Sequence, residues 1–147
     1  MKRISQYVVI SMLLVLFSVA HARDDLVRFS IEEAMTSSDA EAKLGAGIKF
    51  FFGDQKHPKV ATKIGTYTSN KKTNAFGKSD LRACSWAFLS AMVSLQDRAI
   101  AEGGNAVVNI RSYYKKHDFS SATEFECGAG SVVAGVTLVG EVVKLAE

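Results

Sequence analysis

Four side chains of the sequence could bind a metal ion or form a cross-link: Cys84, Cys127, His57 and His117. Two cysteines and two histidines can make a tetrahedral zinc site. The chain has no C-x-x-C or H-x-x-x-H spacing, however, and these residues fall in four different segments. The two cysteines can also pair with each other and leave no thiol over. The pattern therefore favours a Cys84–Cys127 disulfide, and a metal site remains as the alternative.

Acid–base catalysis would have to use Glu124, Glu126 and His117. The two glutamates are two positions apart on an expected strand, so they share one face, and we expect that face to be wet. A glycosidase needs two carboxylates across a cleft, and no other feature of the sequence indicates one. The motifs G-x-S-x-G and H-E-x-x-H are absent. We expect no catalysis, and these three residues are the ones to substitute if an activity is found.

Gly77-Lys78-Ser79 lies directly before an expected long helix, where a phosphate-binding P-loop would end. The full motif also requires a glycine at the position that Lys72 occupies, and no strand ending in Asp follows to hold Mg²⁺. The incomplete motif does not support an ATPase or any nucleotide cofactor. We interpret Lys78 as a loop residue and Ser79 as a helix cap.

The element expected to position these residues is a helix from Asp80 to about Glu102. Ser79 or Asp80 would cap it, and Gly103-Gly104 would end it. Its apolar stripe consists of Leu81, Cys84, Phe88, Met92, Leu95 and Ala99, with Trp86, Leu89, Val93 and Ile100 on the flank. So wide an apolar arc predicts a helix that lies across a sheet.

Strand-like segments surround this helix at residues 48–52, 59–68, 105–114, 124–127 and 132–145. Residues 24–45 read as two short helical turns with capping-box spacing at Ser30 and Ser38, whereas residues 70–78 read as a polar loop and 115–121 as a turn. The order predicts an α+β fold, with one long helix packed on a small mixed or antiparallel sheet and preceded by short helical turns. Phe50 to Phe52 cannot share one face, so either both faces of that strand are covered or it lies at an edge.

Residues 1–22 have the pattern of a secretory signal peptide. Lys2 and Arg3 precede an apolar run, and Ala20-His21-Ala22 suits signal peptidase. The run of about 12 residues is too short to span a bilayer, and no cysteine nearby could carry a lipid. We expect cleavage after Ala22, no stable membrane anchor, and a single exported domain over residues 23–147. It would be soluble in the periplasm or secreted, where a disulfide can persist.

Composition and charge narrow the function classes further. A chain of 147 residues with 48% hydrophobic and 22% charged side chains is typical of one globular domain. The formal net charge of +3 includes Lys2 and Arg3, which the signal peptide would remove. The remaining basic clusters, Lys71-Lys72-Lys78 and Lys115-Lys116, are too small for a nucleic-acid surface. We expect no nucleic-acid partner.

The junction between the helix and the next strand resembles a known family. Residues 99–104 (AIAEGG) run directly into residues 105–110 (NAVVNI), which is similar to the A-x-x-x-G-A-N-A-V-V signature of YbjQ-like domains and, more loosely, of the envelope stress sensor RcsF. The resemblance covers about Val60 to Leu145 and implies a small helix-on-sheet unit. YbjQ-like relatives are often labelled heavy-metal binding and form ring-like oligomers. RcsF-like relatives are disulfide-bonded, act through protein contacts and carry a lipid anchor, for which this chain has no cysteine.

A second resemblance concerns residues 80–91 (DLRACSWAFLSA), with residues 74–79 before them and 127–130 after. They look like a group of exported proteins that carry the label of an excinuclease ATPase subunit. The fragment Gly77-Lys78-Ser79 could have prompted that label, and the missing P-loop glycine argues against it.

These observations predict a non-catalytic exported domain, stabilised by the disulfide, that binds an unknown envelope protein or a second copy of itself. The candidate surface is Tyr113-Tyr114-Lys115-Lys116, with Phe50 to Phe52 as an extension, because tyrosine combines apolar area with a polar tip. The alternative is a periplasmic metal-binding protein that uses the cysteines and His57 or His117.

Overall fold

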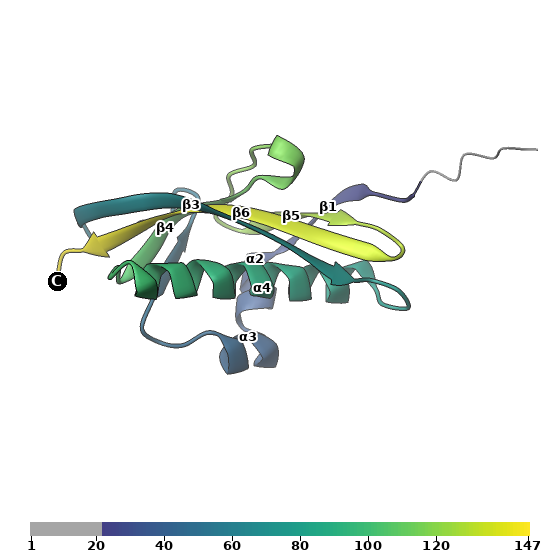
Figure 1. Cartoon of the computed structure of the whole chain (residues 1–147), viewed down its shortest axis with the longest axis horizontal. Coiled ribbons are helices and arrows are strands. Elements are labelled where there is room, and N and C mark those ends of the chain that lie inside the picture. The colour runs from purple at the N-terminus through teal and green to yellow at the C-terminus, as the bar shows by residue number, and fades with distance from the viewer. Residues whose placement is uncertain (1–21) are drawn as a thin grey trace, which may run out of the picture.

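A single six-stranded sheet forms the centre of the fold, and the long helix α4 lies across one of its faces (Figure 1). The computed structural model describes residues 22–147, so the predicted signal peptide lies outside the described residues apart from Ala22. The elements are β1 (Asp25–Ser30), α2 (Ile31–Met35), α3 (Ser38–Lys43), β2 (Lys49–Phe52), β3 (Val60–Asn74), α4 (Asp80–Ala101), β4 (Ala106–Ser112), the 3-10 turn η1 (Tyr114–Lys116), β5 (Glu124–Ala129) and β6 (Val133–Leu145). The expected α+β class, with a long helix on a mostly antiparallel sheet, is confirmed.

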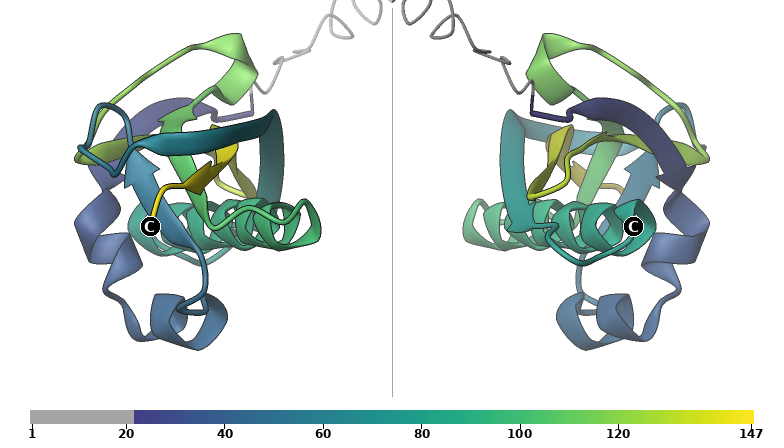
Figure 2. Two further views of the ribbon diagram at one scale, coloured as in Figure 1. Left: turned by 90° about the vertical axis from the view of Figure 1, so that its left-hand side faces the viewer. Right: turned by 90° about the vertical axis from the view of Figure 1, so that its right-hand side faces the viewer.

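Strand β6 connects the whole sheet. β3 pairs with it in antiparallel fashion along its length, from Val60 opposite Leu145 to Asn74 opposite Val133. On the other side of β6, β5 pairs with its first residues and β4 with its later ones. β1 adds antiparallel to β5, and β2 adds parallel to β4, so the sheet is mixed. The views in Figure 2 show α4 under this sheet, with α2 and α3 beside it.

Two parts of the expected strand pattern are wrong. Residues 25–30 form β1 and not a helical turn, because Val27 and Phe29 alternate toward the core while the strand pairs with β5. Residues 70–74 continue β3 and are not a loop, because Asn70 to Asn74 pair with the apolar strand β6. Of the two helical turns, the first is capped by Ser30 as expected, and the second by Ser37 in place of Ser38.

Helix α4 begins and ends as the sequence predicts. The Ser79 hydroxyl accepts a hydrogen bond from the Arg82 backbone N–H at 3.2 Å, which caps the first turn. At the other end Gly103 adopts φ +77°, a left-handed conformation that favours glycine, and the Gly104 N–H donates to the Ala99 carbonyl at 2.9 Å. The chain can therefore turn at once into β4. Among residues 22–147, no helix combines the length and the apolarity that crossing a membrane requires.

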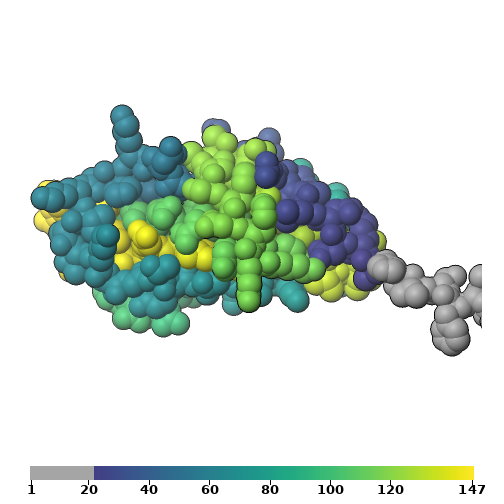
Figure 3. All heavy atoms as spheres, turned by 90° about the horizontal axis from the view of Figure 1, so that it is seen from above, coloured from purple at the N-terminus to yellow at the C-terminus, as the bar shows by residue number. Residues whose placement is uncertain are grey.

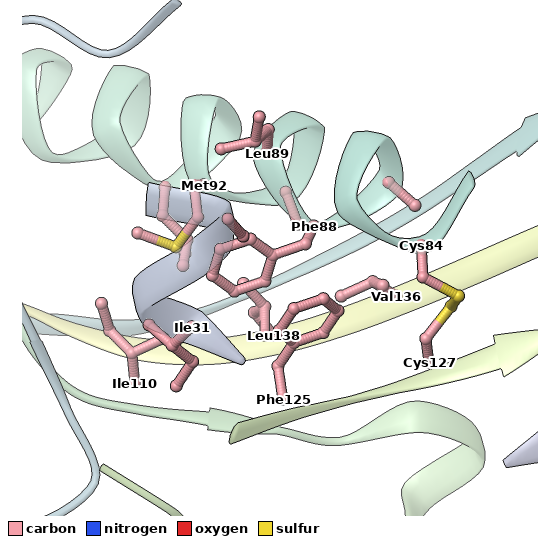
Figure 4. Close-up of a cluster of buried hydrophobic side chains, with 14 of the residues drawn as sticks. Ile31, Cys84, Phe88, Leu89, Met92, Ile110, Phe125, Cys127, Val136 and Leu138 are labelled. Atoms are coloured by element: carbon pink, nitrogen blue, oxygen red, sulfur yellow. A yellow bond between two sulfur atoms is a disulfide. The ribbon is translucent and has the colours of Figure 1, made fainter. Parts of the chain in front are cut away.

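The core lies between α4 and the sheet, and it contains a row of aromatic rings. Phe88 of α4 stacks on Phe125 of β5 (Figure 4), with ring centroids 4.2 Å apart. The Phe29 ring lies 6.2 Å from that of Phe125, and the Phe52 ring 6.1 Å from that of Phe88. The predicted stripe is buried at Cys84, Phe88, Met92, Leu95 and Ala99. Three predicted apolar positions are instead exposed: Leu81 (46%), Trp86 (44%) and Ile100 (60%).

Cys84 and Cys127 form the predicted disulfide, which joins the first turns of α4 to β5 (Figure 4). Their Cα atoms are 5.8 Å apart, within the usual range for such a bond. Both residues are fully buried in the core. A disulfide of this kind is expected in an oxidising compartment.

The three phenylalanines of β2 cover both faces of an edge strand. Phe50 and Phe52 pack against the core between α4 and the sheet, whereas Phe51 packs against a second small cluster on the other face of the sheet. That cluster contains Ala106, Val108, Val143 and Leu145. Both alternatives left open by the sequence are therefore true, because in the described part of the chain β2 pairs with β4 alone and still has two covered faces.

Candidate functional site

The face of the sheet that points away from α4, here called the outer face, is crossed by the segment between β4 and β5. This segment, residues 113–123, contains η1 and lies over the middle of the sheet (Figure 3). It carries all four residues of the predicted contact surface as well as His117. The outer face is therefore where the sequence candidates gather.

Tyr114 anchors this segment to the sheet. A Cβ atom added at Gly128 would lie 2.1 Å from the Tyr114 ring, and one added at Gly135 would lie 3.1 Å from it. The ring thus occupies the space that side chains would fill on β5 and β6. Its hydroxyl donates a hydrogen bond to Asp24 Oδ1 at 3.0 Å, and the ammonium of Lys115 forms an ion pair with the same carboxylate. Tyr114 is consequently half-buried, with its hydroxyl tied to the chain just before β1.

The backbone after Tyr114 is strained. Lys115 and Lys116 have φ values of +49° and +66°, a left-handed conformation that costs a residue with a Cβ about 1–2 kcal/mol. Two such residues in succession persist only when their surroundings hold them in place. The contacts of Tyr114 and Lys115 with Asp24 provide one of the two supports. As a result the side chains of Lys115 and Lys116 are exposed on η1.

The second support is a cluster around Glu126. Its side chain is 1% exposed, although the sequence predicts a wet face. That prediction is wrong because the segment above β5 covers Glu126 and supplies His117, whose Nδ1 lies 2.7 Å from Glu126 Oε1. From β1, the Arg28 Nε donates to Oε2 at 3.2 Å, and its guanidinium lies 3.9 Å from the centre of the Phe119 ring. The buried carboxylate therefore ties the segment to β1 and β5.

Glu124 does not join this cluster. It stands at the exposed start of β5, where its backbone N–H donates to the Ser121 hydroxyl. The structure thus brings together two of the three residues considered for acid–base chemistry, His117 and Glu126. Glu126 fixes the ring so that its other nitrogen, Nε2, points away from the carboxylate. The His117–Glu126 contact thus orients the imidazole. It also holds residues 113–123 against the sheet.

The predicted metal ligands are not brought together. Both cysteine sulfurs are in the disulfide, and His57 lies in the loop between β2 and β3, where its Nδ1 contacts the Pro58 carbonyl at 2.8 Å. His117 lies against Glu126. Within residues 22–147, no three His, Cys, Asp or Glu side chains are grouped so that they could hold a metal ion. The disulfide therefore removes the thiolates on which the cysteine-based version of the metal hypothesis depends.

The P-loop fragment has the local structure expected for a loop and a cap. Gly77 adopts φ +71°, and the Lys78 ammonium donates to the Asn74 carbonyl at 2.9 Å. Ser79 caps α4. The Lys78 side chain is therefore hydrogen-bonded to the backbone of its own loop.

The charges around Asp24 connect the Tyr114 contact with strand β3. Lys115 is the main cause of the lowered pKa of the Asp24 carboxyl, and the Tyr114 hydrogen bond and the charge of Lys72 act in the same direction against the effect of burial. Lys72 also packs near Gly135, beside the Tyr114 ring. We call three exposed lysines, Lys72 near Asp24 and the consecutive pair Lys115 and Lys116, the basic face. They come from β3 and η1, which are far apart in the sequence.

We predict that the Tyr114 phenol loses its proton at a higher pH than an ordinary tyrosine. Burial raises its pKa above the usual value of 10.0, and the hydrogen bond to Asp24 raises it further. Its contribution to stability is therefore fully present below the pKa of the unfolded chain and is lost as the pH rises through the folded pKa. NMR titration of the tyrosine ring carbons should show the raised pKa.

The matched variants for this titration are Asp24→Ala and Asp25→Ala. Asp24→Ala removes the hydrogen bond and should lower the Tyr114 pKa, which burial still keeps above the ordinary value. Asp25→Ala alters the neighbouring carboxylate, which pairs with Arg23, and should leave the titration of Tyr114 unchanged. Equal effects of the two substitutions would contradict the assignment.

The sequence does not reveal Asp24, Arg28, Gly128 and Gly135 as parts of this site. A glycine on a strand is a signal for close approach, but only the paired register of β1, β5 and β6 identifies what approaches. Comparisons of the chain with protein-family models, with curated proteins and with solved structures find no match. The resemblance to YbjQ-like and RcsF-like domains therefore stays a prediction.

Proposed function

We propose that the chain is an exported, non-catalytic binding domain whose basic face contacts an acidic surface of another protein. The observation that carries the proposal is the strained pair Lys115–Lys116, which two sets of contacts hold in an exposed position. Backbone strain that the surroundings maintain is concentrated at functional positions of proteins. A preformed loop also loses little conformational entropy on binding.

The charge of this face supports a different protein as the partner in preference to a second copy. Within the described residues Lys72 and Lys116 make no ion pair within 4.0 Å, whereas Lys115 is paired with the carboxylate of Asp24. Two such faces brought together around a two-fold axis would place like charges opposite each other, which is unfavourable. An acidic surface would complement them and would speed up the encounter.

Export and family membership are part of the same proposal. The buried disulfide supports an oxidising compartment, and the sequence pattern of residues 1–22 supports a signal peptide. The resemblance to RcsF-like domains, which act through protein contacts, also agrees with a binding role.

The test is photo-crosslinking in cells that export the protein. A photoreactive amino acid at position 116 is expected to give a discrete adduct with a second, acidic protein. In the same chain, Lys72→Glu should reduce the adduct by up to about fivefold, since one exposed ion pair contributes up to about 1 kcal/mol. Gel analysis and mass spectrometry of the adduct provide the measurement.

The matched control is Lys144→Glu, which reverses an exposed charge at the far end of β6. It should leave the adduct unchanged. Equal losses with both reversals would show a general charge effect and contradict the proposed face. An adduct with a second copy of the chain would show self-association in place of an acidic partner. The absence of any adduct at position 116 would overturn the proposal.

A further inference from the structure

A groove on the other side of the molecule lies between the short helices α2 and α3 and the first half of α4. It has a volume of about 540 Å³, within the range of sites that hold small molecules. Residues of α2, α3 and the turn between them form one wall, and one side of α4 with the residues before it forms the other. The basic face lies across the sheet from this groove, so the two surfaces are separate.

The apolar part of the groove is made by Leu81, Trp86 and Leu89 of α4 with Ala34 of α2. Leu81 and Trp86 are two of the three predicted apolar positions of α4 that are exposed, and each keeps more than two fifths of its surface in contact with water. The Lys43 ammonium lies 3.4 Å from the centre of the Trp86 ring, so the indole has a cation on one face. Ligand pockets combine apolar and aromatic side chains with a few polar groups, and this groove contains both kinds.

Apart from Lys43 at the end of α3, which lies on the Trp86 ring, the charged residues of the two walls have opposite signs. Glu33 and Asp39 line the wall formed by α2 and α3, whereas Lys78 and Arg82 line the wall of α4. Within the described part of the chain, Glu33, Asp39 and Arg82 make no ion pair within 4.0 Å. The opposite charges therefore line the two walls of the groove without pairing with each other.

We propose that this groove binds a small zwitterion of the amino-acid or short-peptide class. The ligand carboxylate would lie at Arg82 and Lys78, the ammonium group at Glu33 and Asp39, and an apolar side chain on Leu81 and Trp86. A ligand with a single charge would satisfy one wall and leave the other unpaired. A neutral ligand would satisfy neither, whereas a zwitterion complements both walls and the apolar floor.

The proposal can be tested directly because Trp86 is the only tryptophan of the chain. Its fluorescence therefore reports on the groove alone. Titration of the purified protein with leucyl-leucine is expected to give a saturable change in Trp86 emission, and calorimetry should give the same dissociation constant. The same dipeptide with an acetylated amine and an amidated carboxyl group has no charges and should bind at least about tenfold more weakly.

Two pairs of variants separate the groove from the surrounding surface. Glu33→Gln should raise the dissociation constant of leucyl-leucine about tenfold, whereas Glu32→Gln, on the same helix but outside the groove, should not change it. Arg82→Gln should likewise weaken binding, with Lys144→Gln as its control. Equal binding of the charged and blocked dipeptides, or equal effects within a pair, would overturn the proposal. So would the lack of a saturable signal by both methods.

Discussion

Replacing Cys84 and Cys127 together by alanine is expected to lower the free energy of unfolding by about 4 kcal/mol. The bond joins residues 43 positions apart, so its loss gives the unfolded chain the conformational freedom of a long loop. The substitution also removes two buried sulfur atoms from beside the aromatic core. Urea denaturation followed by far-UV circular dichroism measures the change, as a shift of the midpoint.

The control for this experiment is the wild-type chain unfolded in the presence of a reducing agent, which should match the double variant to within about 1 kcal/mol. A thiol count with elemental analysis on the exported protein tests the same bond. No free thiol and no metal would agree with the disulfide. Two free thiols with one bound metal would contradict the disulfide and favour the metal alternative. A loss of stability below about 1 kcal/mol would contradict its stabilising role.

The elements that the sequence predicts correctly are those whose signals are local. Ser79 caps α4 through its own hydroxyl, and Gly103 ends it through a backbone conformation that glycine favours. The disulfide follows from the cysteine count and from two buried positions on expected elements. In each case the type of the residue itself indicates the local structure, and its neighbours in the fold need not be known.

The elements that the sequence misses depend on a partner strand. Residues 70–74 of β3 are polar, and β6 alone makes them a strand by pairing with them. β1 is short and partly exposed, and it exists because β5 offers an edge for it. Hydrophobic periodicity reports burial on a face, so it does not detect a polar strand at the edge of a sheet.

The prediction for Glu126 fails for a related reason. Alternation along β5 correctly places Glu126 on the other face of the sheet from Phe125 and Cys127. It carries no information about what covers the face on which Glu126 lies. The covering segment brings His117 and crosses the sheet, and Arg28 arrives from the strand that the sequence missed. A buried carboxylate of this kind is accommodated only because both partners are present.

The two supports of the basic face differ in how sharply they can be tested. Removal of the Glu126 side chain would alter a cluster of several charges, so its effect would have several causes. The contact of Tyr114 with Gly128 is a matter of space alone, because the position that a Cβ would take is 2.1 Å from the ring. A single methyl group at position 128 is therefore enough to displace the Tyr114 ring and the segment that it anchors.

Gly128→Ala is expected to destabilise the protein by about 1–3 kcal/mol and to release residues 113–121 from the outer face. The new methyl group and the Tyr114 ring cannot occupy the same space, so the ring must leave and its hydrogen bond to Asp24 is lost. Hydrogen exchange of the η1 amides, together with urea denaturation, measures both effects. The photo-crosslink from position 116 should weaken at the same time, because the lysines are then no longer held in place.

Two further variants make this prediction specific. Gly47→Ala adds the same methyl group where nothing lies within 4 Å, and it should be neutral or slightly stabilising. In a Tyr114→Ala background no ring opposes the methyl group, so Gly128→Ala should then cost less than about 0.5 kcal/mol. A cost that stays the same in both backgrounds would mean that β5 itself rejects the side chain. In that case Tyr114 would not be the anchor of the basic face.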